Sequence, residues 1–362
     1  MNFELNEEER KFEEALSRFL HKSGYPDRAC EVQLEKDFER GLYTEMCSLG
    51  FLFPDIPEEA GGGGLPSSFS VIPFRLLGKY LFPSPALDSY IALSLMSQDE
   101  RLRGTARETC GGAKMFSTAI SGEEPAEGKR KGGKIRVRSG EKFAFYAGDA
   151  DGLVVDVLLD GGRVPLLLLK GEYEAERIET MSDGQTYAVR CDAECSEERI
   201  LGNSEDLDSA LCRMWMLSSA EMLGMAEGAF ERAVAYSNER IQFSRTIGSF
   251  QAVRHMLADD YMNIRGCGFM VHEAAYLCGI GAEDWKGASA LAFLMAEETS
   301  EAAAKNSHQV HGAMGFTTEM PIHLYYKRAK SIGKSRGDRR AIEETILAHW
   351  NGPLWIKEED VK

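Results

Sequence analysis

The sequence lacks three features that mark whole classes of protein: long apolar runs, a leader segment and paired cysteines. No stretch of eighteen or more apolar residues occurs, so we expect no membrane-spanning helix. The first residues, MNFELNEEERKFEEAL, are acidic and do not have the basic segment and apolar run of a secretory signal. We therefore predict a cytoplasmic protein.

The cysteines and the charge balance exclude further classes. Eight cysteines are scattered along the chain, and none forms the two short paired spacings of a zinc site, so we expect reduced structural thiols and no metal. The formal net charge of −16 argues against nucleic acid or an anionic membrane surface as the main partner.

Three zones of different patterning follow one another along the 362 residues. Residues 1–112 place apolar side chains at helical spacing, and residues 113–202 carry short apolar runs between glycine-containing turns, as strands and hairpins do. Residues 203–362 contain long stretches rich in Ala, Met and Leu that are apolar over more than one face. The sequence predicts an α+β fold, mostly α, with an N-terminal helical domain, a small middle β-barrel or sandwich domain, and a C-terminal four-helix bundle.

Two segments in the last third carry the most specific motifs. Residues 236–260 read YSNERIQFSRTIGSFQAVRHMLADD, and residues 309–330 read QVHGAMGFTTEMPIHLYYKRAK. Together they resemble the helical C-terminal domain of the acyl-CoA dehydrogenase family of flavoproteins. The run FLFPDIPEEAGGGG resembles the first domain of the same family, and the predicted order of domains is also the family's.

This resemblance implies an activity, a cofactor and partners. Such enzymes oxidise the Cα–Cβ bond of an acyl-CoA thioester: a carboxylate removes the α-proton and FAD accepts the β-hydride. An electron-transferring flavoprotein or a similar acceptor usually takes the electrons.

The resemblance also assigns residues to the cofactor. Arg240 and Gln251, eleven positions apart, match residues that hold the FAD of a neighbouring subunit, and an arginine fork suits its pyrophosphate. Phe243 lies where the family's aromatic residue packs near the adenine. A loop that wraps the same cofactor matches Gln309, Val310, His311, Gly312 and Ala313. Each residue taken singly is as well explained by a structural role, but their joint spacing favours the family interpretation.

One position departs from the family in a way that bears on catalysis. Counting on from Gln309 without a gap, Arg336 stands where such enzymes carry their catalytic glutamate, usually within Tyr-Glu-Gly-Thr. A guanidinium cannot accept the α-proton. The other position that the family uses for a base corresponds to Ile241 or Gln242, and Glu239 is one step out of register. The sequence therefore predicts no catalytic base at the usual positions.

The middle zone has drifted as well, since Thr118, Ser121 and Pro125 are the only remnants of the motif that holds the flavin ring. The leading hypothesis is a subunit of an FAD-dependent acyl-CoA dehydrogenase that a paralogous partner completes in an α2β2 assembly. Two alternatives stay open. One is a homo-oligomeric dehydrogenase with a relocated base such as Glu239, and the other is an inactive scaffold that binds acyl-CoA or FAD.

Overall fold

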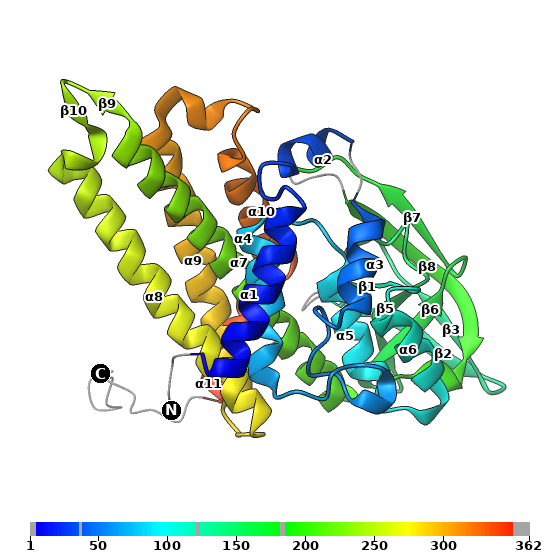
Figure 1. The fold of residues 1–362 in the computed structure, drawn as a ribbon. Coiled ribbons are helices and arrows are strands. Elements are labelled where there is room, and N and C mark those ends of the chain that lie inside the picture. Colours follow the sequence, from blue (N-terminus) through cyan, green and yellow to red (C-terminus); the bar gives the residue numbers. More distant parts are fainter. Residues whose placement is uncertain (1–4, 36–37, 121–123, 182–184, 350–362) are drawn as a thin grey trace, which may run out of the picture.

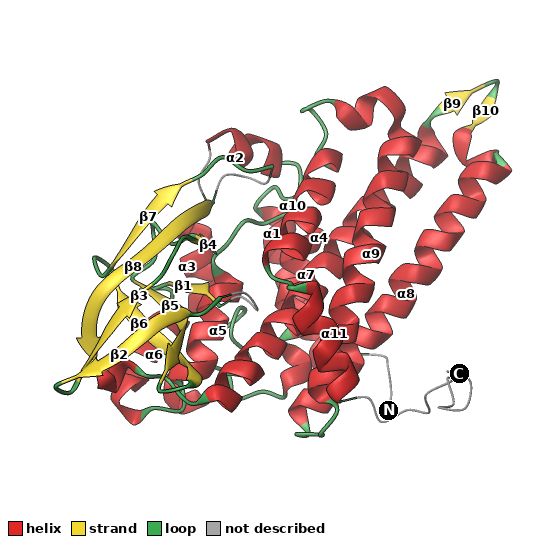
Figure 2. Ribbon diagram, turned by 180° about the vertical axis from the view of Figure 1, so that it is seen from behind, coloured by secondary structure: helices red, strands yellow, loops and turns green. Residues whose placement is uncertain are grey.

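Helices at both ends of the chain flank a β sheet in the computed structural model, which describes residues 5–35, 38–120, 124–181 and 185–349. Figures 1 and 2 show the sheet on one side of the molecule and the long C-terminal helices on the other. This order confirms the predicted fold class, whereas the predicted domain limits at residues 112 and 202 stay predictions. Within the described part, no helix combines the length and the apolar character that crossing a membrane requires.

The N-terminal helices form the first layer. Their bounds are α1 (Glu7–Lys22), α2 (Ala29–Glu35), α3 (Arg40–Ser48), α4 (Val71–Lys79), α5 (Ala86–Met96) and α6 (Arg103–Cys110). A capping box begins α1, because Asn6 and Glu9 exchange side-chain and backbone hydrogen bonds. Helix α5 is buried along nearly its whole length because it packs against both α7 and the sheet strand β1. A polar residue on α5 is therefore placed deep inside the molecule.

The middle layer is a mixed sheet. Its strands are β1 (Phe116–Ala119), β2 (Ala126–Lys131), β3 (Lys134–Arg138), β4 (Lys142–Phe145), β5 (Gly152–Leu159), β6 (Gly162–Leu169), β7 (Tyr173–Arg177) and β8 (Thr186–Ser196). The strand order is β1-β5-β2-β3-β8-β4, with β6 paired to β5 and β7 to β8. Strand β1 runs parallel to β5 and is buried at all four positions, since α5 covers it. Ser89 fixes this contact by accepting a hydrogen bond from the Phe116 amide at 3.1 Å.

The C-terminal helices form the bundle. They are α7 (Ser204–Glu239), α8 (Gln251–Gly279), α9 (Trp285–His311), α10 (Ile322–Ser335) and α11 (Arg339–Ala348). Helix α7 is the central element and packs against α4, α5, α8, α9 and α10, which explains why its apolar residues are not confined to one face. Between α7 and α8, strands β9 (Ile241–Gln242) and β10 (Arg245–Thr246) form a hairpin that projects from one end of the bundle (Figure 1).

Candidate functional site

The backbone of Arg336 is fixed at the meeting point of the three layers. Arg336 is the residue that ends α10, and its carbonyl accepts a 3.0 Å hydrogen bond from the indole N–H of Trp215 on α7. Its side chain, only 9% exposed, points into the interior and not toward solvent. The guanidinium therefore occupies the position that the sequence identified for a base.

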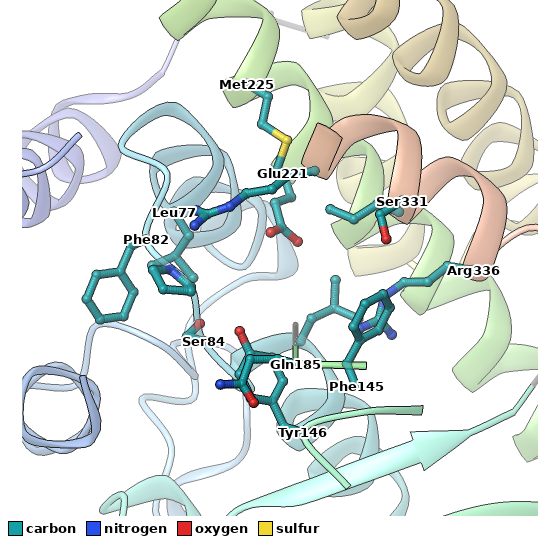
Figure 3. A pocket seen from close by; sticks show the side chains of 14 residues that line it. Leu77, Phe82, Ser84, Phe145, Tyr146, Gln185, Glu221, Met225, Ser331 and Arg336 are labelled. Atoms are coloured by element: carbon teal, nitrogen blue, oxygen red, sulfur yellow. The ribbon is translucent and has the colours of Figure 1, made fainter. Parts of the chain in front are cut away.

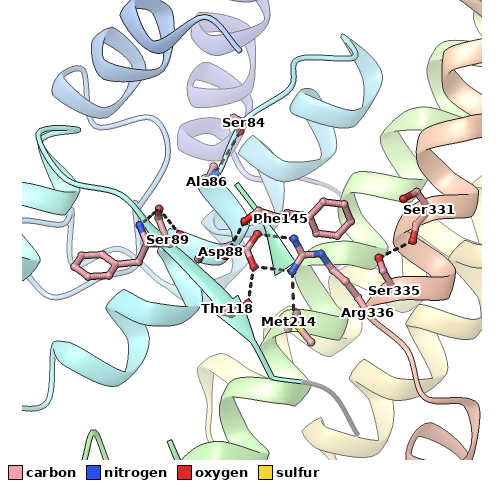
Figure 4. Close-up of polar contacts among 12 residues, drawn as sticks. Ser84, Ala86, Asp88, Ser89, Thr118, Phe145, Met214, Ser331, Ser335 and Arg336 are labelled. Atoms are coloured by element: carbon pink, nitrogen blue, oxygen red, sulfur yellow. Dashed lines mark hydrogen bonds and ion pairs between the residues drawn. The ribbon is translucent and has the colours of Figure 1, made fainter. Parts of the chain in front are cut away.

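A buried carboxylate holds this guanidinium (Figure 4). Asp88 on α5 is 1% exposed and accepts two hydrogen bonds from Arg336, at 3.0 Å from Nη1 and 2.6 Å from Nη2. The Thr118 hydroxyl donates to the same carboxylate at 2.5 Å, and the Arg336 guanidinium lies 4.7 Å from the centre of the Phe145 ring. Burial acts to lower the pKa of Arg336, but the charge and hydrogen bonds of Asp88 outweigh it and raise the pKa. Arg336 is thus a permanent cation in a bidentate ion pair.

A cleft runs between the sheet and α10 and narrows toward this ion pair. Its outer part has a volume of about 410 Å³, within the usual range of roughly 300–1,000 Å³ for small-ligand sites. The outer part is lined by Lys142, Phe143, Phe145, Ile178, Thr180, Met181, Thr186, Lys330, Ser331, Lys334 and Ser335. The inner end, at Thr118, Met214 and Arg336, has a volume of only about 30 Å³.

Polar groups at the inner end and next to it are already engaged within the chain. The Thr118 hydroxyl is bonded to Asp88, and the Ser117 hydroxyl donates to the Phe145 carbonyl at 2.7 Å. Thr180 and Thr186 contact each other through their hydroxyl groups at 3.4 Å. The tricyclic ring of a flavin does not fit the residues at this end. Of the other motif remnants, Ser121 lies outside the described residues.

A second cavity lies on the other side of Arg336 and contains a carboxylate that the sequence analysis missed. Glu221 of α7 points into this cavity of about 80 Å³ (Figure 3). Burial raises the pKa of Glu221 to about 7, partly opposed by the charges of Arg336 and Arg328. Its carboxylate makes no hydrogen bond to any described residue. The signal for Glu221 was its position as a lone carboxylate in the apolar stretch from Met214 to Ala226.

The predicted cofactor residues Arg240, Phe243 and Gln251 lie together at the far end of α7, around the hairpin. Arg240 ends α7, its side chain is exposed, and it forms no ion pair with the residues that the structure covers. Phe243 is 87% exposed and has a left-handed backbone conformation with φ of 51°. Gln251 is the first residue of α8 and is also exposed.

The segment from Gln309 to Ala313 is not a loop, so that prediction is wrong: after α9, Gly312 and Ala313 begin a short 3-10 helix. Gln309, Val310 and His311 form the last turn of α9, and the chain leaves the helix only at Gly312, where φ is 58°. Val310 is buried, as is His311, which bonds through Nδ1 to the Ser307 carbonyl at 2.7 Å; burial lowers the pKa of His311.

The same histidine connects the two predicted cofactor regions. The His311 ring stacks on Tyr236 of α7 with the ring centres 4.5 Å apart. Since Tyr236 lies one helical turn before Arg240, the end of α9 lies beside the end of α7. Gln309, Gly312 and Ala313 are the exposed members of the segment.

Glu239 cannot serve as the base at Arg336 of its own chain. It lies 24 residues after Trp215 on the same continuous helix, which corresponds to about 36 Å along the axis. Trp215 itself contacts the Arg336 carbonyl, so the distance to the candidate base position is of the same order. Within one chain Glu239 is therefore too far from Arg336 to act there, and the homo-oligomeric alternative stays a prediction.

Family models and solved structures agree on the class of protein. The model "Acyl-CoA dehydrogenase, N-terminal domain" matches residues 6–98, and "Acyl-CoA dehydrogenase, C-terminal domain" matches residues 209–348. The chain belongs to the acyl-CoA dehydrogenase family, whose members are FAD flavoproteins and oxidoreductases that act on CH–CH groups.

Individual relatives match almost the whole chain. "Acyl-CoA dehydrogenase IpdE2" of Mycolicibacterium smegmatis is 27% identical over 95% of this chain and 100% of its own length. Benzylmalonyl-CoA dehydrogenase of Aromatoleum aromaticum is 26% identical over 90% of this chain and 93% of its own. A chain of the ChsE4-ChsE5 complex from Mycobacterium tuberculosis superimposes with a TM-score of 0.87 and 25% identity, covering 98% of this chain and 100% of that one. Butyryl-CoA dehydrogenase from Megasphaera elsdenii has the same fold, with a TM-score of 0.85 and 20% identity over 96% of this chain and 99% of that chain.

Proposed function

We propose that this chain is a subunit of an FAD-dependent acyl-CoA dehydrogenase and that a paralogous subunit supplies the catalytic glutamate, in an α2β2 assembly. The observation that carries this proposal is the Arg336–Asp88 ion pair. Arg336 cannot accept a proton, and Asp88 is held by two hydrogen bonds from that same cation. Neither residue is available to remove the α-proton of an acyl-CoA.

The far end of the bundle supports the second half of the proposal, in which this chain completes the cofactor site of its partner. Arg240 and Gln251 present donors to solvent from two helices joined by one short hairpin. An unpaired arginine fork binds a pyrophosphate through charge-assisted bidentate hydrogen bonds. Phe243, raised at the tip of the hairpin, offers a ring face to the adenine. Gln309, Gly312 and Ala313 add exposed backbone and amide groups at the neighbouring end of α9.

In this assembly the chain binds and orients, while proton removal belongs to the partner. FAD supplies the hydride acceptor when bound. The positive charge of Arg240 offsets the mutual repulsion of the cofactor's phosphates. Gln251 hydrogen-bonds a neighbouring polar group of the cofactor through its amide. The substrate class is an acyl-CoA thioester, and an electron-transferring flavoprotein or a similar acceptor reoxidises the cofactor. We expect this chemistry in the cytoplasm. The ChsE4-ChsE5 complex of Mycobacterium tuberculosis, in which two differently named chains assemble, supports the hetero-oligomeric form.

A second candidate, an inactive subunit that binds acyl-CoA or FAD as a scaffold, is favoured by one observation. The outer cleft of about 410 Å³ stays open although its inner end is closed, so a ligand can enter it without reaching a reactive group. For a homo-oligomeric enzyme with a relocated base, Glu221 is a further candidate, because it lines the cavity beside Arg336.

Co-expression with a paralogue that has an intact Tyr-Glu-Gly-Thr run tests the proposal. We expect the pair to copurify, to be yellow and to desaturate an acyl-CoA in the presence of a dye acceptor. Replacing the partner's glutamate by glutamine should abolish turnover, whereas the chain alone should have none. Desaturation by the chain alone would refute the proposal, and a colourless, inactive complex would favour the scaffold.

A further inference from the structure

Four groups from three layers meet at the inner end of the cleft (Figure 4). Asp88 comes from α5, Thr118 from β1, Phe145 from the end of β4, and Arg336 from the end of α10. The guanidinium faces the Phe145 ring and is hydrogen-bonded to Asp88 along its edge, and Met214 contacts its Nη1 at 3.5 Å. We infer that these side chains form an internal plug at the position of the flavin ring, so that this chain provides no flavin site of its own.

The plug is stable because its side chains pair their charges and hydrogen-bonding groups with one another. The cation and the carboxylate cancel in charge, and Thr118 donates to Asp88. Entry of a ring would separate a buried ion pair and leave each charge without its partner in a region with little access to water. The bond from Trp215 to the Arg336 carbonyl also fixes the backbone that carries the guanidinium. Moving the side chain aside together with its backbone would break this bond.

The space next to the plug does not offer a substitute site for the ring. The cavity at Glu221 measures about 80 Å³, well below the range typical of small-ligand sites. The outer cleft is wider, and Phe143 on its wall is 58% exposed, but it ends at the plug. A ligand in the outer cleft would therefore not reach Thr118, Asp88 or Arg336, none of which lines that part.

The inference deepens the proposed function. Only one of its consequences, the FAD content of the assembly, rests on the proposed function. If each partner chain holds one FAD and each plugged chain holds none, the α2β2 assembly contains one FAD for every two chains. The plug itself is a property of this chain alone, and its first test needs no partner.

Riboflavin is a suitable probe, because it has the flavin ring but lacks the adenosine diphosphate part that Arg240 and Phe243 would hold. We expect wild-type chain to leave riboflavin fluorescence unquenched. The variant with Arg336→Gly, Asp88→Ser and Phe145→Ser opens the inner end and should bind riboflavin at least tenfold more tightly. A matched control, Arg75→Met with Glu227→Leu and Glu13→Gln, removes another part-buried ion cluster, between α1, α4 and α7, and should stay like wild type.

Three outcomes would overturn the inference: one-to-one riboflavin binding by wild type, no gain in a folded opened variant, or an equal gain in the control. If the opened variant does not fold, the FAD content of the wild-type assembly decides the question. One FAD for every two chains supports the plug, and one FAD per chain refutes it. These results do not test the proposed function. That proposal fails if the assembly does not desaturate an acyl-CoA, whatever FAD content the assembly has.

Discussion

Two arginines beside α7, Arg336 and Arg240, differ in their burial and in their ion pairing. Beside Trp215 of α7, Arg336 is buried and paired, whereas Arg240, directly after the last residue of α7, is exposed and makes no ion pair with the described residues. The first arrangement satisfies the cation inside one chain, and the second leaves it available to a ligand. The comparison shows that the same residue type is structural in one place and a candidate binding group in the other. The difference lies in burial and in the presence of a partner.

The largest expected effect comes from removing the buried cation alone. Arg336→Ala leaves the buried Asp88 carboxyl without its counter-charge, which should lower the free energy of unfolding by about 3–5 kcal/mol. Replacing both partners, as Arg336→Met with Asp88→Leu, should restore most of that loss because no charge is left buried. Urea unfolding followed by circular dichroism measures both.

The matched control is Arg340→Ala, since Arg340 pairs with Glu344 on the exposed face of α11. Its cost should be far smaller than that of Arg336→Ala, since fully exposed ion pairs contribute little to stability. Equal losses for Arg336→Ala and Arg340→Ala would mean that the buried pair has no special role.

The contrast between these arginines also shows how far the sequence could lead. Motif spacing located Arg336, and periodicity predicted the order of helices, sheet and bundle. Asp88 was not foreseen, because it is a single acidic residue in the apolar run ALDSYIALSLM and its partner lies 248 residues away. Only the packing of α5 between β1 and α7 brings them together. In the same way, the end of α9 was misplaced because His311 is held in the helix by Ser307 and Tyr236 rather than by a local sequence signal.

A second test concerns Glu221, which shares the surroundings of Arg336 but lacks a hydrogen-bonding partner among the described residues. Its pKa is about 7 in the fold and should be near 4.5 in the unfolded chain. As the pH rises, the unfolded chain therefore loses the proton of Glu221 at a lower pH than the folded chain does. The stability that protonated Glu221 contributes is complete below pH 4.5 and is lost as the pH rises toward 7.

Glu221→Gln should remove this dependence. At pH 8 the variant is expected to be more stable than wild type by up to roughly 3 kcal/mol, with little difference at pH 4.5. Unfolding curves at both values measure it, and Glu344→Gln, at an exposed site, serves as the control that should leave the pH slope unchanged. An identical slope in Glu221→Gln and wild type would show that Glu221 does not titrate in this range.

The third test addresses the exposed arginine. Arg240→Ala should weaken FAD binding by the assembly about tenfold to a hundredfold, because a charge-assisted hydrogen bond contributes about 1.5–3 kcal/mol. Stability of the chain alone should hardly change, in contrast to Arg336→Ala. FAD release on dilution, followed by flavin fluorescence, measures the affinity. Unchanged FAD binding in Arg240→Ala would remove Arg240 from the proposed cofactor site.

The smallest effect is expected at the hairpin tip, where Phe243 and Ser244 have φ angles of 51° and 63°. Left-handed backbone costs a bulky residue about 1 kcal/mol, and asparagine adopts it more readily. Phe243→Asn should therefore stabilise the isolated chain by about 0.5–1 kcal/mol while weakening FAD binding by the assembly. Ser244→Gly relieves similar strain but keeps the ring, so it should stabilise the chain and leave FAD binding intact. If both variants bind FAD as wild type does, the strained conformation of Phe243 does not serve the cofactor, and Phe243 is removed from the proposed cofactor site.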